Sequence, residues 1–295
     1  MRRSPTGLTC PLALAAVCSA LSGCVNGPVN LKYTGAPPKS LEQMDWSGWG
    51  LTLGRCVVNG LVDYSKLAED HAALDNFLFL AGRYGPNRTP PLFPTRDHSL
   101  AYAINCYNAT VVRSVLAIHE KTGRLPSVLP IGFARRFTFV IDGRPQTPAD
   151  LRTTALRLAQ YDVRVELVLC DARRDGPPIP PRVFLPDLLD AQLTLAARNA
   201  LTAPQVVGLD HGAPKQLLLW SGLYRRRAEL IAVYENRYQT RGASMINVLC
   251  DWSGHQRRIT LNSAVGYVVA PAPADARLND VVVPPPRMLG ELTFF

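Results

Sequence analysis

Two asparagines three positions apart are the residues with the clearest chemical meaning. Asn105 and Asn108 stand in the apolar run Ala103-Ile-Asn-Cys-Tyr-Asn-Ala-Thr110. A buried side-chain amide has two donors and two lone pairs, and leaving it unpaired costs about 1–3 kcal/mol. Backbone groups of irregular segments or a bound molecule could satisfy them. We expect the two amides, with Tyr107 between them, to hold distant loops at one polar centre. Whether that centre also lines a cleft stays open.

A thiol and a short C-terminal motif are the other groups that could join this centre. Cys170 and Asp171 follow an apolar segment, and Asp251, Trp252 and His255 lie close together further along the chain. A reactive thiol needs a nearby base or a positive environment, and among the histidines His255 is the best candidate for that base. The alternative is that Cys170 is a small buried apolar residue. Trp252 and Tyr107 are likewise either core aromatics or walls of a cleft.

Patterns that bind metals or cofactors are missing from the sequence. His119-Glu120 begins like a zinc protease motif, but Gly123 stands where the second histidine is needed. The cysteines and histidines show no zinc spacing, and no glycine-rich phosphate loop or dinucleotide motif is found. Cys56, Cys106, Cys170 and Cys250 each lie in an apolar context, which favours buried thiols over disulfides. The sequence therefore predicts no metal and no cofactor.

A long amphipathic helix must carry the two asparagines. Asp97 or Ser99 can cap its start, and Gly123 can end it. Apolar residues at helical spacing form one stripe, and Asn108 belongs to that stripe while Asn105 lies on its flank. The stripe consists of Leu100, Ile104, Tyr107, Val111, Val115 and Ile118.

The remaining pattern predicts one α+β domain over residues 44–270, with several helices packed on a small mixed β-sheet and long Pro/Gly-rich loops. A strand is expected at Phe137–Ile141, with a hairpin turn at Asp142-Gly143. Buried or extended strands are expected at 163–170 and 246–249. Helices are expected at 148–158, 185–201 and 224–238, and a loose Pro-rich tail at 271–295.

The first residues indicate export. Arg2 and Arg3 precede an apolar stretch at 8–20 that is too short to span a bilayer core of about 30 Å, which is the pattern of a signal peptide. The ending Leu21-Ser22-Gly23-Cys24 resembles the lipobox of bacterial lipoproteins. That resemblance implies a signal peptide at 1–23, a lipid on Cys24 and a tether at 24–43. It also implies a lipid-anchored protein of the cell envelope, attached to the outer membrane and facing the periplasm.

Composition narrows the partners. The chain has 47% apolar residues, which is typical of a globular protein, and a formal charge of +9. The basic residues are dispersed, and the run Arg225-Arg226-Arg227 has no aromatic residues interleaved for base stacking, so no nucleic acid is predicted. The expected partners are the membrane, through the N-terminal lipid, and an unidentified envelope ligand or protein.

Several motifs in this order resemble the uncharacterised DUF547 family. The resemblance covers about residues 57–262 and is carried by Ala101-Tyr-Ala-Ile-Asn-Cys-Tyr-Asn-Ala109, Phe137-Thr-Phe-Val-Ile-Asp-Gly143, Arg164-Val-Glu-Leu-Val-Leu-Cys170 and Leu249-Cys-Asp-Trp-Ser253. This sequence departs from the family pattern at several positions. Arg152-Thr153 replaces a Glu-His pair, Glu166 replaces a histidine, and Gly176 replaces a second cysteine.

These departures favour a binding role at a polar cleft. The alternatives are a thiol- or carboxylate-dependent hydrolase or transferase acting on an envelope substrate, and an envelope assembly scaffold. A convergence of Asn105, Asn108, Cys170 and Asp251 around one pocket, with a histidine in reach, would favour the enzyme.

Overall fold

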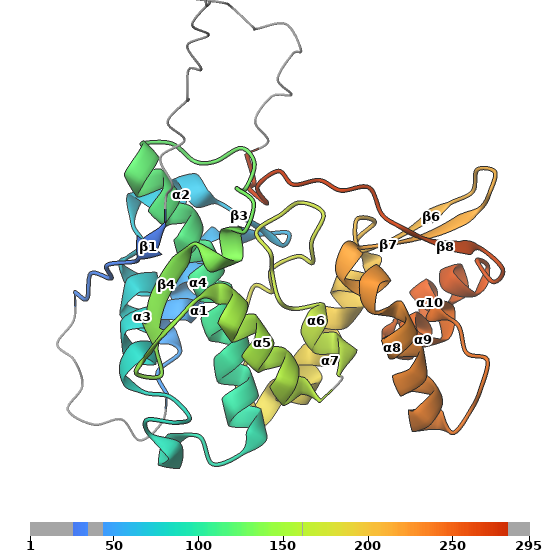
Figure 1. Cartoon of the computed structure of the whole chain (residues 1–295), viewed down its shortest axis with the longest axis horizontal. Helices are drawn as coiled ribbons and strands as arrows, with labels where there is room; N and C mark the ends of the chain where they lie inside the picture. The colour runs from blue at the N-terminus through green and yellow to red at the C-terminus, as the bar shows by residue number, and fades with distance from the viewer. Residues whose placement is uncertain (1–25, 35–43, 161, 283–295) are drawn as a thin grey trace, which may run out of the picture.

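The computed structural model describes residues 26–34, 44–160 and 162–282 (Figure 1). The expected signal peptide and the expected lipidation site Cys24 lie outside these residues. Within them the chain forms a single mixed α+β domain, as the sequence predicted. No described helix is long and apolar enough to cross a membrane.

Helices account for most of the regular structure. The α-helices are α1 Ser47–Cys56, α2 Tyr64–Glu69, α3 Ala72–Arg83, α4 Arg96–Thr122, α5 Pro148–Ala159, α6 Val163–Glu166, α7 Leu189–Thr202, α8 Ser221–Tyr238, α9 Met245–Trp252 and α10 His255–Asn262. Short 3-10 turns are η1 Pro90–Leu92, η2 Phe133–Arg135 and η3 Pro186–Leu188.

The strands form three small sheets in the described residues, where the sequence analysis expected one. The order is β1-β4-β5, β2-β3 and β6-β7-β8, with β1 parallel to β4 and β8 parallel to β7. The strands are β1 Gly27–Pro28, β2 Val57–Val58, β3 Leu61–Val62, β4 Phe137–Ile141, β5 Arg144–Gln146, β6 Val207–Asp210, β7 Gln216–Leu219 and β8 Val268–Pro271.

Helix α4 is the central element, and its ends follow from local chemistry. The Thr95 side chain accepts a hydrogen bond from the His98 amide, so the cap lies just before the predicted start. Gly123 ends the helix in the left-handed region with φ of 72°, which glycine adopts without a steric penalty. Every residue from 100 to 118 is buried, so even polar side chains on this helix face protein.

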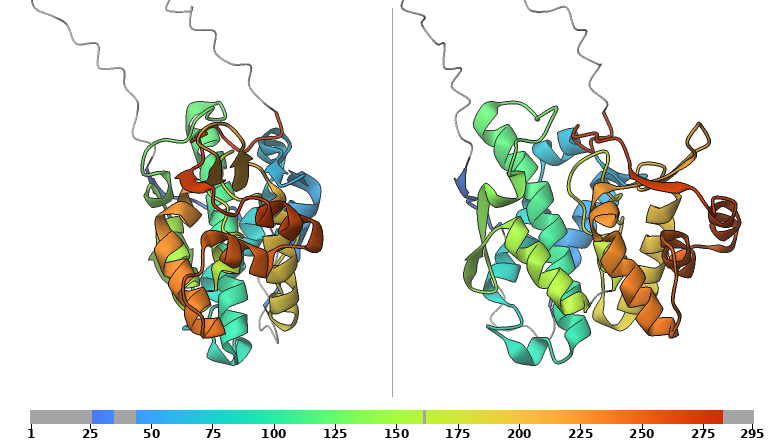
Figure 2. Two further views of the ribbon diagram at one scale, coloured as in Figure 1. Left: turned by 90° about the vertical axis from the view of Figure 1, so that its right-hand side faces the viewer. Right: turned by 45° about the vertical axis from the view of Figure 1, so that its right-hand side comes forward.

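The hairpin predicted after α4 is present in the structure. Strand β4 pairs with β5 across Asp142-Gly143, whose φ values of 52° and 72° are those of a tight hairpin turn. Helix α5 then begins with a capping box between Thr147 and Asp150. These elements lie against α3 and α4 on one side of the molecule (Figures 1 and 2).

Two clusters of buried apolar residues divide the interior. The larger cluster contains residues of α1–α5 and β4. The smaller contains residues of α7, β6, β7, α8 and α9, including Trp220, Leu223 and Leu249. Figure 1 shows α6 and α7 between α5 on one side and α8 on the other. Segment 163–170 touches both clusters, because Val163 and Leu167 belong to the smaller one and Val165 and Cys170 to the larger.

Two strand predictions were wrong for identifiable reasons. Segment 163–170 is the short helix α6 followed by turns, because Asp162 caps the Arg164 amide and the Asn108 side chain binds the backbone further on. Segment 246–249 is helical because Ser244 and Asn247 form a capping box that starts α9. In both segments side chains satisfy backbone groups that a strand would pair with a neighbour.

The segments at both ends of the described chain pack on the domain. Residues 26–34 were expected to be tether, but the Lys32 amide donates to buried Asp75 and Tyr33 stacks on Phe79. Residues 271–282 were expected to be part of a loose tail, but Leu278 is buried and its segment bridges to residues 62, 128 and 173. The ordered domain is therefore longer at both ends than its pattern suggested.

Candidate functional site

The Asn105 amide holds the loop that precedes α7. Its nitrogen donates to the Phe184 carbonyl at 2.8 Å, and its oxygen accepts from the Phe184 amide at 3.1 Å. Asn105 is 1% exposed. The side chain thus acts as a substitute strand partner for one residue of an irregular segment, which confirms the predicted pinning role.

The Asn108 amide does the same for the segment before Cys170. Its nitrogen donates to the Val168 carbonyl at 3.0 Å, and its oxygen accepts from the Cys170 amide at 2.9 Å. The term amide centre denotes Asn105, Asn108 and the backbone groups to which their side chains are hydrogen-bonded. Both amides are occupied by backbone groups of the chain, so the amide centre needs no bound molecule to satisfy them.

The Cys170 thiol is neither exposed to solvent nor readily deprotonated. It is 1% exposed, and burial raises its pKa to about 12. Its sulfur accepts hydrogen bonds from the Ala172 amide and from the Asn279 side chain, and the Tyr64 hydroxyl in turn donates to Asn279. A neutral thiol held in this way is a poor nucleophile, because the thiolate is the reactive form.

An ion-pair network lies beside the amide centre. Tyr107 donates to Asp171 at 2.9 Å, and Arg152 binds both Asp171 and Glu166. Arg226 of α8 contacts the second Glu166 oxygen at 3.1 Å. Burial raises the pKa of Tyr107 well above its ordinary value, so its hydroxyl remains a donor. The network joins α4, α5, α6 and α8 and leaves Glu166 only 3% exposed.

Two departures from the DUF547 motifs meet in this network. Arg152 and Glu166 stand where that resemblance would place a glutamate and a histidine, and here they form an ion pair. Burial opposes the charge on Arg152, but Asp171, Tyr107 and Glu166 together outweigh it and raise the pKa of the guanidinium. Both Glu166 oxygens and the Arg152 guanidinium are therefore engaged by groups of the chain itself.

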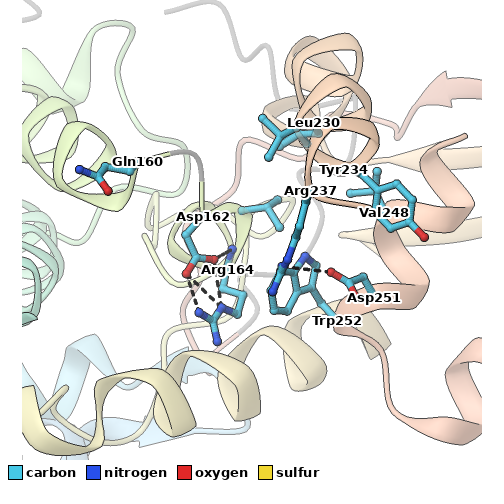
Figure 3. A pocket seen from close by; sticks show the side chains of 11 residues that line it. Gln160, Asp162, Arg164, Leu230, Tyr234, Arg237, Val248, Asp251 and Trp252 are labelled. Atoms are coloured by element: carbon cyan, nitrogen blue, oxygen red, sulfur yellow. Dashed lines mark hydrogen bonds and ion pairs between the residues drawn. The ribbon is translucent and has the colours of Figure 1, made fainter. Parts of the chain in front are cut away.

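A separate pocket lies between α6, α8 and α9 (Figure 3). Its volume is about 260 Å³, and two of the predicted site residues, Asp251 and Trp252, line it. The other described lining residues are Gln160, Asp162, Val163, Arg164, Leu230, Val233, Tyr234, Arg237 and Val248. We call this cavity the Trp252 pocket.

Two arginines lie over the Trp252 ring. The guanidinium carbons of Arg164 and Arg237 are 4.7 and 5.1 Å from the ring centroid, within the range of cation–π attraction. Arg164 comes from α6 and Arg237 from α8, and Figure 3 shows Arg164 paired with Asp162 and Arg237 lying against Trp252. The indole is thereby held in one orientation at the pocket wall.

The two arginines differ in how many donors remain open. All three Arg164 nitrogens are bound, to Asp162, Asp190 and Thr194. Arg237 makes one long contact of 3.4 Å with Asp251, whose other oxygen accepts from Tyr238. The other Arg237 N–H groups have no hydrogen-bond partner among the described residues, and because Arg237 lines the pocket they could bind an anionic oxygen there.

The structure brings together some predicted site residues and separates others. The Cys170 backbone amide donates a hydrogen bond to the Asn108 side chain, and next to them the Tyr107 hydroxyl donates to Asp171. Asp251 and Trp252 belong to the Trp252 pocket and make no contact with the amide centre among the described residues. His255 is exposed at the start of α10 and does not line that pocket. The expected convergence on one pocket is therefore wrong for Asp251 and for His255 as a base.

Several residues that matter in these sites were not predicted. Arg152, Arg226, Arg164 and Arg237 hold or line the sites, and contacts such as Arg152–Asp171, Arg226–Glu166 and Arg237–Trp252 join residues distant in sequence. Two local pairs were signals in the sequence: Asp162 caps and pairs Arg164 two residues later, and Glu229 pairs with Arg226 at i,i+3 spacing. No group of three or more potential metal ligands occurs in the part of the chain that the structure describes.

A comparison with protein families matches residues 93–200 to the family of proteins of unknown function DUF547. The matched segment runs from before α4 into α7, so it contains the amide centre but not the α8 and α9 walls of the Trp252 pocket. No curated protein and no solved structure matches the chain.

Proposed function

We propose that the chain is a lipid-anchored envelope protein with a binding role, and that its ligand site is the Trp252 pocket. The ligand class is a small anion with an aromatic or apolar body. The observation that carries this proposal is the open guanidinium of Arg237 beside the Trp252 ring. A carboxylate or phosphate could bind the guanidinium while the body of the ligand contacts Tyr234 and Val248.

The state of Cys170 weighs against the thiol-dependent alternative. A nucleophile must reach its substrate and must be deprotonated near the operating pH. The Cys170 sulfur meets neither condition, because it is buried and surrounded by two hydrogen-bond donors. Glu166 and Asp171, the nearby carboxylates, are each paired with an arginine. A binding role requires none of these groups to react.

Ligand binding can be tested with a matched pair of probes, 4-methylbenzoate and its neutral amide. The two molecules share shape and apolar surface and differ in charge. We expect the purified chain to bind the carboxylate more tightly, with a measurable change in tryptophan fluorescence. Arg237→Gln should weaken carboxylate binding about tenfold and leave the amide nearly unchanged, since a charge-assisted bond contributes roughly 1.5–3 kcal/mol.

Arg225→Gln is the control, because Arg225 is an exposed arginine on the same helix that does not line the pocket. It should leave both affinities unchanged. Equal affinity of the wild-type chain for the two probes, or equal losses in both variants, would refute the proposed ligand class.

The anchor needs its own experiment. The chain is expressed in a bacterium with an outer membrane and supplied with an alkyne-bearing fatty acid. We expect label on the wild-type chain, recovery in the outer-membrane fraction, and loss of both in Cys24→Ser. Label that persists in Cys24→Ser would exclude Cys24 as the anchor.

A further inference from the structure

A second and larger cavity lies along α7. Its volume is about 750 Å³, within the range of small-molecule sites. Its described lining residues are Asn59, Gly60, Pro178, Ile179, Pro180, Pro181, Arg182, Phe184, Leu188, Gln192, Leu195, Ala196, Asn199, Thr202, Ala203 and Gln205. We call it the proline groove. It shares none of these residues with the Trp252 pocket.

The walls of the proline groove are fixed before any ligand arrives. Asn105 holds Phe184 through two hydrogen bonds. Gln192 of α7 holds the adjoining residues in the same way, donating to the Val183 carbonyl and accepting from the Leu185 amide. The Ile179 amide donates to the Gly60 carbonyl, which ties the proline segment to the β2–β3 turn. A preformed site loses little entropy on binding.

The groove exposes apolar side chains that nothing in the described chain covers. Leu188, the last residue of η3, is 53% exposed, and Leu195 of α7 is 61% exposed, and both line the groove. Exposed apolar surface that gathers around a cavity marks a binding site rather than ordinary surface variation.

One charged group stands at the groove. Among the described lining residues Arg182 is the sole ionisable side chain, and it is exposed. It has no hydrogen-bond or ion-pair partner within residues 26–34, 44–160 and 162–282. A ligand that fits this arrangement is apolar along its length and carries one anionic end.

The proline wall disfavours a peptide in the groove. Pro178, Pro180 and Pro181 have no N–H group, so this wall cannot donate to an extended peptide backbone. A peptide would lose hydrogen bonds to water there without replacing them. An acyl chain has no such groups to satisfy.

We propose that the proline groove binds a single long acyl chain ending in a carboxylate, as in a free fatty acid, with the carboxylate paired to Arg182. The chain lies along α7 between Leu195 and the proline wall. This site goes beyond the Trp252 pocket and does not depend on it.

The test is titration calorimetry on the full chain, produced without lipid attachment by Cys24→Ser. The probes are decanoate below its micelle concentration, decanamide and butyrate. We expect decanoate to bind at least about a hundredfold more tightly than butyrate, because each buried methylene contributes roughly 0.8 kcal/mol. Decanamide should bind several-fold more weakly than decanoate, because it cannot form the ion pair.

Variants locate the site. Leu195→Glu, which places a carboxylate in the groove, should abolish decanoate binding. The control Ile259→Glu makes the same kind of change at an exposed position of α10, where Ile259 is 52% exposed, and should bind as wild type. Arg182→Gln should weaken decanoate about threefold to tenfold and make decanoate and decanamide equal.

Two results would overturn the proposal. The first is decanoate affinity that falls in Arg237→Gln but not in Arg182→Gln, which would place the ligand in the Trp252 pocket. The second is decanoate binding only to a chain that ends at Val282, because residues 283–295 would then be the native occupant of the groove. Failure of the proposed function at the Trp252 pocket would leave both readouts unchanged.

Discussion

The amide centre and the Trp252 pocket contain similar groups and use them differently. In the amide centre and the ion-pair network beside it, Asn105, Asn108 and Arg152 each bind another part of the chain. In the Trp252 pocket Arg164 is fully bound while Arg237 keeps open donors. In the first region the side-chain donors and acceptors are paired with loop backbone or with other side chains. In the second, some Arg237 donors remain unpaired among the described residues and border a cavity.

The difference teaches how to separate structural from functional polarity. A polar residue near many others is weak evidence of a site, because buried polar groups are almost always paired. The Trp252 pocket differs because Arg237 has N–H groups without a hydrogen-bond partner among the described residues, next to the apolar side chains that line the pocket. Experiments that perturb each region in turn test this difference.

The largest contrast is expected in thiol reactivity. Native chain treated with iodoacetamide at pH 8 should label Cys250, which is partly exposed, at least about a hundredfold faster than Cys170. A pKa near 12 leaves roughly one thiolate in ten thousand at that pH. Peptide mapping by mass spectrometry gives the two rates, and both cysteines should label fully in denaturant. Comparable native rates would mean that the amide centre opens to solvent.

The amide centre should respond strongly to loss of one amide. Asn108→Ala removes both bonds to the segment before Cys170 and leaves the Val168 carbonyl and Cys170 amide unpaired. We expect the free energy of unfolding to fall by about 2–4 kcal/mol, measured by urea denaturation. Asn236→Ala, at an exposed position, is the control and should change it by less than about 0.5 kcal/mol. A similar small change in both would show that the amide centre is not structural.

Removing the pocket tryptophan should have a smaller effect. Trp252 is partly exposed and Trp220 is 3% exposed in the same apolar cluster. We expect Trp252→Ala to lower the free energy of unfolding by about 1–2 kcal/mol and Trp220→Ala by about 3–5 kcal/mol. Equal losses in thermal or urea unfolding would make Trp252 a core residue and the pocket a packing defect.

The smallest effect concerns a buried carboxyl outside both regions. Burial raises the pKa of Asp280, so the folded chain binds this proton more tightly than the unfolded chain. This group therefore lowers stability as the pH rises above its unfolded pKa of about 3.9. Asp280→Asn should match wild type near pH 3 and exceed it by roughly 0.5 kcal/mol at pH 7. Urea denaturation at both pH values tests this, and a less stable variant at pH 7 contradicts it.

The sequence predicted the elements whose signals are local. Helix α4, the β4–β5 hairpin and helix α5 have caps, turn residues and periodicity within a few residues of their ends. The burial of Asn105 and Asn108 and their role toward the loops also followed from position on one helix.

Long-range pairing was beyond the sequence pattern. The segment 163–170 reads as a strand because of its β-branched residues, but the Asn108 amide supplies its backbone partners from a distant helix. Likewise Arg237 and Trp252 meet only because α8 and α9 pack together. No residue spacing within either helix indicates that contact, so the Trp252 pocket could be found only from the structure.

The parallel pairing of Gly27 with Phe137 has a consequence for geometry at the bilayer. If Cys24 bears the proposed lipid, only residues 25 and 26 lie between the acylated residue and Gly27, the first residue paired in a sheet. Such a leash spans at most about 10 Å. Strand β4 would then lie close to the lipid headgroups, and rotation of the domain relative to the membrane would be restricted. A ligand or partner would therefore approach from the side that faces away from the membrane.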